Sequence, residues 1–555
     1  MCGIWACVGF SNEILDNPNL CIQQLKDRGP EGTRRVDLSG CILGFTRLAI
    51  NGLNEDGMQP MKNGRLWWMC NGEIYNWEVL AEKYGIIGQS GSDCEVLGYL
   101  YQKIVVDEGG DPAAFFRMLD GVYAIVIVDT LLNTITIARD PYGVRPLFIG
   151  TRFNLLGNQI IPTSIIVASE IKATWPIVQS VTQFTPGTYE TYNMKTLQPI
   201  SKGRHHYIQH LKNPLYSSLV PNGLEAACSA LRTSLEVAVR KRMLAERPVA
   251  ALLSGGVDSS LIASLVAKEL REIGGPPLKT FSIGMAGSQD LAYARKVADW
   301  IGSDHHEIVM TANDFLTAIP TVIRIIESYD TTTVRASVGN WLVAREVARR
   351  CDCKVLFNGD GSDEVFGSYL YFNNAPHDSA YEEEVSRLLG EIHLFDVLRS
   401  DRCISSNGLE PRTPFLDKQF VNVARSIATE WLRPIKGVKA EKWILRRAFD
   451  DGVTLPHEVL WRRKEAFSDG VSSQEKSWYE LIQEHTESYV TEGWEERAKQ
   501  AYPNMTPTTS EQFFYRFHFE ANYGKPSTHF VIPHFWMPRW SPGVTDPSAR
   551  TLAVY

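Results

Sequence analysis

The feature that most constrains the fold of this chain is the segment 254–260, which reads Ser-Gly-Gly-Val-Asp-Ser-Ser. A short apolar stretch, 249–253, precedes it, and residues 261–270 carry apolar side chains at helical spacing. A strand that turns through two glycines into a helix leaves backbone N–H groups free to bind an anion. Asp258 is out of place beside phosphates unless a cation lies between them. The segment therefore predicts a site for a polyphosphate carried with Mg²⁺.

This segment is not a Walker loop, because it lacks Gly-Lys-Ser/Thr and its glycine spacing differs. It resembles the pyrophosphate-binding loop, Ser-Gly-Gly-x-Asp-Ser, of ATPases that cleave ATP between its α and β phosphates. Such enzymes attach AMP to an acceptor and hold the leaving pyrophosphate in the loop. The alternative is a serine-rich turn in which Asp258 only complements the helix dipole. Seven matching residues between a strand and a helix favour the nucleotide site.

Two regions of different pattern follow each other along the chain. The first two hundred residues are mostly β, with one helix expected at 93–104, whose start carries the capping-box pattern Ser92-x-x-Glu95. Strands are expected there at 42–46, 66–70, 122–128, 134–138 and 165–168. From about residue 224, helices and strands alternate, which predicts a doubly wound parallel sheet with ligands at the carboxyl ends of its strands. The expected helices are 225–243, 290–301, 314–327 and 337–350, and the expected strands are 249–253, 279–283, 306–310 and 354–358; beyond residue 412 the chain reads as mainly helical.

Composition limits the class of protein. A chain of 555 residues with 44% apolar and 22% charged residues indicates a globular protein of two domains. Its net charge of −8 gives no basic field for nucleic acid. We find no apolar run that could span a membrane, no signal peptide and no disulfide framework among ten cysteines, so a reducing, cytoplasmic location is expected. Cys351-x-Cys353 is interpreted as two buried thiols rather than a metal site.

The N-terminus suggests a nucleophile. Removal of Met1 would make Cys2 the first residue, with a thiol nucleophile and an α-amine of near-neutral pKa on one carbon frame. The amine can serve as the base, so that no histidine is needed. Any chain may begin Met-Cys, and the motifs that follow therefore decide the interpretation.

Five motifs follow Cys2 in sequence and together resemble the class II glutamine amidotransferases. They are Asp27-Arg28-Gly29-Pro30, Phe45-Thr46-Arg47-Leu48, Asn71-Gly72-Glu73-Ile74-Tyr75-Asn76, Gly91-Ser92-Asp93-Cys94-Glu95 and Asp120-Gly121. The resemblance implies an N-terminal-nucleophile hydrolase with a four-layer αββα sandwich. Asp27 departs from the family, which often has histidine there, and we assign it no catalytic role.

The resemblance also implies roles for individual residues. Cys2 would attack the glutamine amide, and the Asn71 side chain with the Gly72 backbone N–H would form the oxyanion hole. Arg47 would bind the α-carboxylate of glutamine and Asp93 its α-ammonium. Singly, each has an ordinary explanation: a surface charge, an Asn-Gly hairpin turn or a helix-dipole partner. The remaining expected glutamine contacts are Leu48, Ala49, Ile50, Asn51 and Glu73.

The whole chain resembles the glutamine-hydrolysing asparagine synthetases almost from end to end. Further matching motifs are Phe281-Ser282-Ile283-Gly284, Asp304-His305-His306-Glu307, 329–337, 361–367, Pro414-Phe415-Leu416-Asp417, Trp461-Arg462-Arg463-Lys464-Glu465 and 546–552. The resemblance implies that aspartate, ATP and glutamine give asparagine, glutamate, AMP and pyrophosphate through β-aspartyl-AMP. Ammonia would pass between the sites inside the protein. We do not interpret His305-His306 as a metal pair, because adjacent residues on a strand point to opposite faces.

Site residues of the synthetase reaction follow from the same resemblance. Asp258 and Asp363 would bind Mg²⁺, and Lys464, with Lys442 behind it, would neutralise phosphate charge. The expected ATP contacts are Leu252, Ser254, Gly255, Gly256, Asp258, Ser259, Ser260, Ile283, Asn358, Gly359, Lys442 and Lys464. Thr332, Thr333 and Arg335 would hold aspartate. Where the family usually reads Ser-Gly-Glu, this chain reads Asn358-Gly359-Asp360, and Asp360 takes the place of a glutamate that supports intermediate formation and helps deprotonate ammonia.

The expected organisation is a glutaminase domain at 1–205, a linker at 206–223, an ATP-pyrophosphatase domain with a helical C-terminal part at 224–530, and an extended or mobile tail at 531–555. A homodimer is expected from the family, and no nucleic-acid or membrane partner. Two alternatives stay open. One is a related synthetase, such as a β-lactam-forming relative, and the other is a degenerate homologue that only binds or regulates. The intact glutaminase motifs argue against the first, and the complete phosphate loop against the second.

Overall fold

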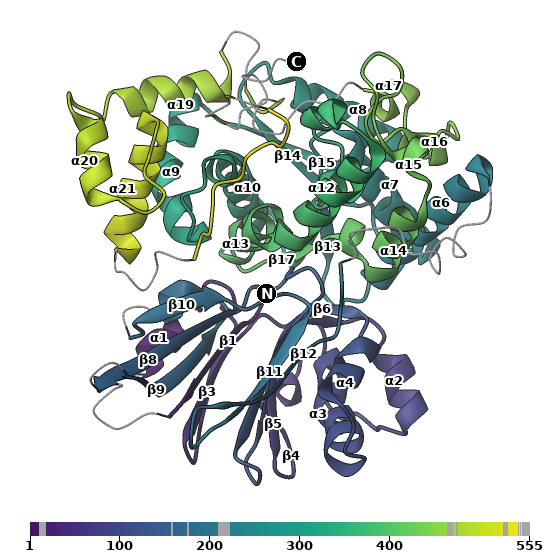
Figure 1. Ribbon diagram of the computed structural model, residues 1–555. Coiled ribbons are helices and arrows are strands. Elements are labelled where there is room, and N and C mark those ends of the chain that lie inside the picture. The colour runs from purple at the N-terminus through teal and green to yellow at the C-terminus, as the bar shows by residue number, and fades with distance from the viewer. Residues whose placement is uncertain are drawn as a thin grey trace.

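The computed structural model describes residues 1–9, 18–156, 159–174, 177–208, 223–462, 470–472, 476–524, 531–541, 543 and 546. Two halves lie one above the other in Figure 1, and the N-terminus lies at their junction. The N-terminal half contains two six-stranded sheets, and the C-terminal half contains a five-stranded sheet surrounded by helices. Among the described residues, no helix is both long and apolar enough to cross a bilayer.

The first sheet holds the N-terminus in its centre. Strand β1 (Gly3–Val8) is buried along its whole length and lies between β3 (Cys41–Arg47) and β9 (Gln159–Ala168), antiparallel to both. The full order is β10-β8-β9-β1-β3-β2, with β2 at Gly32–Leu38, β8 at Phe148–Leu156 and β10 at Ser180–Gln183. Because Cys2 directly precedes β1, its backbone is fixed by the centre of a sheet rather than by a free end.

The second sheet carries the Asn71-Gly72 pair. Its order is β12-β11-β7-β6-β5-β4, and β5 (Leu66–Ile74) pairs antiparallel with β6 (Gly121–Asp129). The other strands are β4 (Met61–Asn63), β7 (Thr134–Arg139), β11 (Thr188–Asn193) and β12 (Pro199–Arg204). Apolar side chains of both sheets form one shared core, while helices α2 (Trp77–Tyr84), α3 (Val96–Tyr101) and α4 (Pro112–Met118) cover the outer face of the second sheet. With α1 (Pro18–Gln23) against the first sheet, the layers are αββα as predicted.

The expected helix at 93–104 is present, but its start differs from the prediction. It begins as a 3₁₀ turn, η2 (Asp93–Glu95), continues through α3 and ends as the π-helical segment η3 (Gln102–Asp107). Ser92 caps it by accepting from the Cys94 N–H, but Glu95 binds the N–H groups of Gln89 and Ser90 instead of that of Ser92. The predicted capping box is therefore wrong, because the Glu95 carboxylate binds N–H groups of the preceding turn.

The third sheet is parallel, in the order β15-β14-β13-β16-β17. Its strands are β13 (Val249–Leu252), β14 (Lys279–Gly284), β15 (Asp304–Val309), β16 (Val355–Phe357) and β17 (Glu410–Arg412). Helices α6 (Leu224–Lys241), α7 (Val257–Glu272) and α8 (Gln289–Ile301) share one core, and α9 (Ala312–Ile326) and α10 (Thr331–Arg350) share the other. The doubly wound prediction is confirmed. Strand β17 was not predicted, because it is three residues long with proline in its middle.

The C-terminal part is mainly helical, as expected. Its helices are α11 (Ser362–Phe366), α12 (Asp378–Glu391), α13 (Asp396–Ser405), α14 (Lys418–Ser426), α15 (Thr429–Leu432), α16 (Trp443–Ala448), α17 (His457–Leu460), α19 (Trp478–Glu487), α20 (Trp494–Ala501) and α21 (Ser510–Tyr523). The described part of the tail, 531–541, contains no helix or strand but is packed: Trp536 is buried and donates its backbone N–H to Asp330. Most of the expected linker, 209–222, lies outside the described residues.

Two smaller predictions concern cysteine and histidine. Cys351 and Cys353 form a disulfide, and Cys351 is partly exposed, so the interpretation as two buried thiols is wrong. The two residues lie between the end of α10 and β16, where the chain turns sharply enough to bring them together. Both ring nitrogens of His305 are hydrogen-bonded, to Thr280 and Ser282, and His306 stacks on Phe281; that the two histidines are not a metal pair stays a prediction.

Candidate active sites

The candidate nucleophile lies at the junction of the two halves. The Cys2 Sγ lies 3.5 Å from the backbone oxygen of Leu48, and the Arg28 guanidinium donates to the Cys2 carbonyl at 3.0 Å. The Met1 α-ammonium is buried 3.4 Å from the Leu409 carbonyl of the C-terminal half. Burial lowers the pKa of this ammonium to about 6 and raises the pKa of the Cys2 thiol to about 11. With Met1 in place, the thiol is therefore a weak nucleophile.

The expected oxyanion hole contains a buried amide with nothing to bind. Asn71 is fully buried on β5, and neither atom of its amide has a hydrogen-bond partner among the residues that the structure describes. A buried polar group without a partner costs about 1–3 kcal/mol, and a catalytic role is one explanation for such a group. Gly72 is next to it, and a Cβ there would lie 2.0 Å from the Val122 oxygen of β6. Only glycine fits this close pairing.

Residues expected around glutamine are linked by contacts. The Arg47 guanidinium donates to the backbone oxygens of Gly52 and Asn54, which fixes its orientation and leaves a second N–H on each terminal nitrogen. Asp93 accepts from the Ile74 N–H at 2.7 Å, and burial raises its pKa to about 6. Glu73 accepts from Asn51, and burial, with the nearby Asp93 charge, raises its pKa well above the usual range. Leu48, Ala49 and Ile50 form the buried turn before Asn51.

The phosphate loop lies at the carboxyl end of the parallel sheet and borders a cavity of about 200 Å³. Gly255 has φ +76°, and a Cβ there would lie 2.6 Å from the Ala294 nitrogen of α8, so the turn requires glycine. The expected ATP residues that line the cavity are Leu252, Ser254, Gly256, Asp258, Ser259, Ile283, Asn358, Gly359 and Lys442. Gly255 and Ser260 do not line it, and Lys464 lies outside the described residues.

Two carboxylates of this cavity meet at one cation. The Lys442 ammonium lies 2.5 Å from Asp258 and 2.7 Å from Asp363, and it is 2% exposed. Burial alone would lower its pKa, but the two carboxylates outweigh burial and raise it above the usual range. Ser362 also donates to Asp258 at 2.8 Å. Asp258 and Asp363 are thus arranged to share a positive charge.

Asp360 also lines the cavity, where its carboxylate faces helix α13. Its carboxylate accepts from Arg399 at 3.2 Å, and Arg399 also pairs with Asp396. Burial raises the pKa of Asp360 to about 6, against the opposite effect of Arg399. A carboxylate with a pKa near neutrality can exchange protons during a reaction.

The residues expected to bind aspartate begin helix α10 and do not line this cavity. Thr333 donates its hydroxyl to Asp330, which caps the helix. The Thr332 Oγ1 is buried and has no hydrogen-bond partner among the described residues. Arg335 is held on one edge by Glu511, at 2.5 and 2.7 Å, and on the other by Asp546, at 2.8 and 3.0 Å. The structure therefore brings the ATP residues together but leaves these three apart from them.

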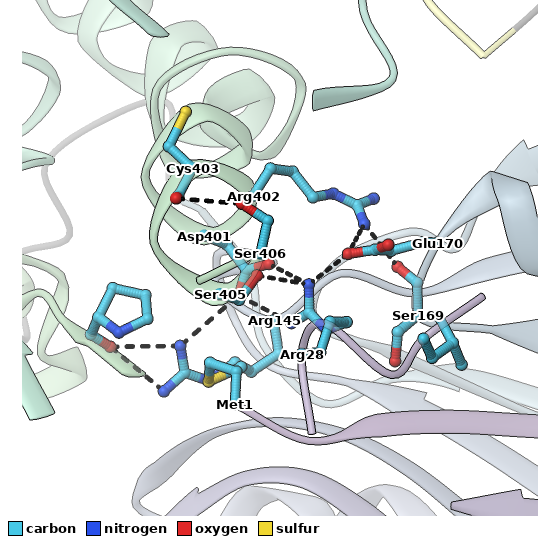
Figure 2. A network of polar contacts seen from close by, with 12 residues as sticks. Met1, Arg28, Arg145, Ser169, Glu170, Asp401, Arg402, Cys403, Ser405 and Ser406 are labelled. Atoms are coloured by element: carbon cyan, nitrogen blue, oxygen red, sulfur yellow. Dashed lines mark hydrogen bonds and ion pairs between the residues drawn. The ribbon is translucent and has the colours of Figure 1, made fainter. Parts of the chain in front are cut away.

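A buried network of charges joins the two halves (Figure 2). Arg28 donates to Glu170, to Asp401 and to Ser405 at 2.8–2.9 Å, and Arg402 lies 3.1 Å from Glu170. All of these side chains are at most 2% exposed. Because Asp401, Arg402 and Ser405 belong to α13, the helix that carries Arg399 also contacts the residue that binds the Cys2 carbonyl.

The sequence interpretation missed Asp396, Arg399 and Glu364. Glu364 is buried, accepts from Tyr369 at 2.5 Å, and its pKa is raised well above the usual range by burial and by Asp396. Glu364 stands in the motif 361–367, but Asp396 and Arg399 occur in no motif that we used. Their signal is a charged pair one helical turn apart, which is common on exposed helix faces.

Comparisons with known proteins agree with this arrangement. The asparagine synthase family model matches residues 230–389 and 373–542, and the glutamine amidotransferase domain model matches residues 1–227. The chain is 41% identical to asparagine synthetase (glutamine-hydrolyzing) of Gallus gallus, over 100% of this chain and 99% of that protein. The proteins of the same name from Mesocricetus auratus and Homo sapiens are 41% and 40% identical, over the same shares of the two chains. The chain belongs to the glutamine-hydrolysing asparagine synthetase family.

Proposed function

We propose that this chain converts aspartate to asparagine with glutamine as the nitrogen donor and ATP as the co-substrate, releasing glutamate, AMP and pyrophosphate. One observation carries the proposal: helix α13 contacts both candidate sites. Arg399 and Ser400 hold the loop of Asp360 and Asn358, and Asp401 holds Arg28 beside Cys2. Two sites bound to one rigid helix suit a reaction in which the product of the first is consumed at the second.

At the first site, loss of Met1 frees the Cys2 α-amine to act as base. The amine takes the thiol proton, the thiolate attacks the glutamine amide carbon, and the nitrogen takes that proton and leaves as ammonia while a γ-glutamyl thioester forms. Water then hydrolyses the thioester, which releases glutamate and restores the Cys2 thiol. The Asn71 amide and the Gly72 N–H stabilise the negative oxygen that develops in this step. Arg47 binds the α-carboxylate of glutamine and Asp93 its α-ammonium; Leu48, Ala49, Ile50, Asn51 and Glu73 complete the contacts.

At the second site, the β-carboxylate of aspartate attacks the α-phosphorus of ATP, which forms β-aspartyl-AMP and releases pyrophosphate. The free N–H groups at the start of α7 hold the pyrophosphate, with Ser254, Ser259 and Lys442. Ammonia then attacks the acyl carbon and AMP leaves. With its pKa near 6, Asp360 is a base at neutral pH and takes the proton from the attacking nitrogen.

A divalent cation fits the donors of this site. Asp258 and Asp363 offer carboxylate oxygens that converge on the single positive charge of Lys442, and carboxylates are the ligands that Mg²⁺ takes beside substrate phosphates. Mg²⁺ would supply charge neutralisation on the pyrophosphate. Lys442 would then turn from the two carboxylates to the phosphates.

Aspartate binding is assigned to Thr332, Thr333 and Arg335. The unpartnered Thr332 hydroxyl supports the assignment, because it needs a hydrogen-bond partner. Arg335 keeps its inner edge on Glu511, so the outer edge, which Asp546 holds, is where a substrate carboxylate would bind. Asp546 must release Arg335 for this to happen.

Free ammonia is mostly ammonium at neutral pH and is then not nucleophilic, so we assign an internal passage between the sites. The division into 1–205, 206–223, 224–530 and 531–555, a homodimer and a cytoplasmic location stay predictions. A β-lactam-forming reaction and a non-catalytic role are the competing functions, and the unpartnered Asn71 amide argues against both, since neither needs an oxyanion hole for glutamine.

Release of pyrophosphate separates the three functions. The proposed enzyme releases pyrophosphate only when ATP and aspartate are both present, and it forms asparagine when glutamine or ammonium is added. A β-lactam-forming relative would release no pyrophosphate with aspartate, but would release it with a carboxylic acid that carries the nitrogen needed to close the ring. A regulatory homologue would release none with any combination of substrates.

A further inference from the structure

Asn358 uses both ends of a buried side-chain amide. It follows β16, is 3% exposed, and donates its Nδ2 to the Ser400 Oγ of α13 at 2.7 Å. Its Oδ1 accepts the backbone N–H of Asp360 at 3.3 Å. The side chain therefore ties the backbone of Asp360 to the helix that also carries its Arg399 partner.

The rest of this loop is fixed by close packing. A Cβ on Gly359 would lie 2.7 Å from the Ser259 nitrogen, so the loop presses directly against the phosphate loop. Gly361 has φ +90° and donates its N–H to Asp396 at 3.2 Å. The segment 358–361 is thus held between the start of α7 and helix α13, and the place of the Asp360 carboxylate depends on this backbone together with Arg399 and Ser400.

The position of the Asp360 backbone matters because the Asp360 side chain is short. Asp360 is one methylene shorter than the glutamate of the family pattern, or about 1.5 Å in reach. An error of about 1 Å in a reacting group costs on the order of a hundredfold in rate. A serine at 358 would have a single polar atom, its hydroxyl oxygen, and this atom lies one bond nearer the backbone than the amide atoms of asparagine. It therefore cannot bind both Ser400 and the Asp360 N–H in the way that the amide does.

We infer that Asn358 is a positioning residue for Asp360, and that the two act as one unit in which a longer neighbour sets the place of a shorter acid. This inference rests on the proposed function, because Asp360 must act on the nitrogen that attacks β-aspartyl-AMP. On this inference, the replacement of Ser-Gly-Glu by Asn358-Gly359-Asp360 is a coupled change at two positions, and it does not weaken the site.

A double-mutant cycle on ammonia-dependent asparagine synthesis tests the inference. The variants are Asn358→Ser, Asp360→Glu and the double variant, each with saturating ATP and aspartate. We expect each single change to lower kcat on the order of tenfold to a hundredfold. The double variant is expected to recover to within a few-fold of the parent, because serine allows the loop to accept the longer acid.

Two controls keep the test specific. Glutamine hydrolysis is expected to match the parent in all variants, since Cys2 is not touched. The thermal unfolding midpoint shows how much of any loss in synthesis comes with a loss of stability. Ser400→Ala removes the hydroxyl that Asn358 binds and that is also hydrogen-bonded to the Asp360 side chain, so it is expected to lower synthesis at least as much as Asn358→Ser. The apparent pKa of synthesis is expected to move in both, which a purely structural contact would not cause.

Parent-level synthesis in Asn358→Ser would overturn the inference, as would losses that simply multiply in the double variant. Failure of the proposed function is a different result: the parent itself would then form no asparagine and no pyrophosphate from aspartate, ATP and ammonium.

Discussion

Replacing Asn71 with leucine is expected to separate activity from stability. The amide is fully buried, and neither of its atoms has a hydrogen-bond partner among the described residues. Its burial therefore costs about 1–3 kcal/mol, which an apolar side chain of similar size would not cost. Loss of one oxyanion donor costs a hundredfold to a thousandfold in kcat, or about 3–4 kcal/mol. Asn71→Leu is expected to leave the free energy of unfolding unchanged or higher while glutamine hydrolysis falls 100- to 1000-fold.

Gln59 provides the matched control for this measurement. It is a buried amide of the same half, but its Oε1 accepts the Cys70 N–H at 2.6 Å and its Nε2 donates to the Cys70 carbonyl at 3.2 Å. Gln59→Leu is expected to destabilise by about 1–3 kcal/mol, since it leaves both backbone groups of Cys70 unpaired. Urea unfolding and a glutaminase assay on both variants give the result. Destabilisation of Asn71→Leu as large as that of Gln59→Leu, or retained glutaminase activity, would refute a vacant oxyanion donor.

Four further changes have definite expected outcomes. Cys2→Ala is expected to abolish glutamine-dependent asparagine synthesis and spare the ammonia-dependent reaction, and equal losses with both donors would contradict two separate sites. Asp258→Asn is expected to raise the Mg²⁺ concentration needed for half-maximal pyrophosphate release, with normal glutaminase activity as the control; an unchanged titration would count against a metal role. Because the pKa of Asp360 is raised to about 6, ammonia-dependent synthesis at constant free NH₃ is expected to rise as pH increases through 6, and Asp360→Asn is expected to be slow and to lack this rise. Arg335→Met leaves the buried Glu511 with Gln483 but without a cation, and is expected to destabilise by about 3–5 kcal/mol and stop synthesis, which thermal unfolding and asparagine formation would show.

Much of the fold followed from the sequence, because periodicity and turn residues report local structure. The strand at 249–253 and the helix after it were predicted to within a few residues, because the two glycines mark the turn between them. Strand β17 was missed because three residues around Pro411 carry no period, and its pairing with β16 depends on distant contacts. The capping box at Ser92 failed for the same kind of reason: a nearby turn offered Glu95 better partners.

The candidate sites were predicted only as far as their motifs reach. The loop residues were predicted to lie together because they follow strands of one sheet. Lys442 was predicted with them, and it faces these loops. Arg399, Asp396 and Arg28 gain their positions from packing between α13 and the N-terminal half, which no short motif records. Glu511, which binds Arg335, lies 176 residues away, so no local pattern indicates that this arginine is held on both edges.

Nitrogen released at Cys2 is expected to reach β-aspartyl-AMP without leaving the protein. The direct measurement uses glutamine labelled with ¹⁵N in its amide, together with ATP, aspartate and an excess of unlabelled ammonium. We expect asparagine that carries mainly ¹⁵N in its side chain, with AMP and pyrophosphate formed in equal amounts. Asparagine that carries the isotope ratio of the bulk ammonium, or glutamate formed without pyrophosphate, would contradict the account.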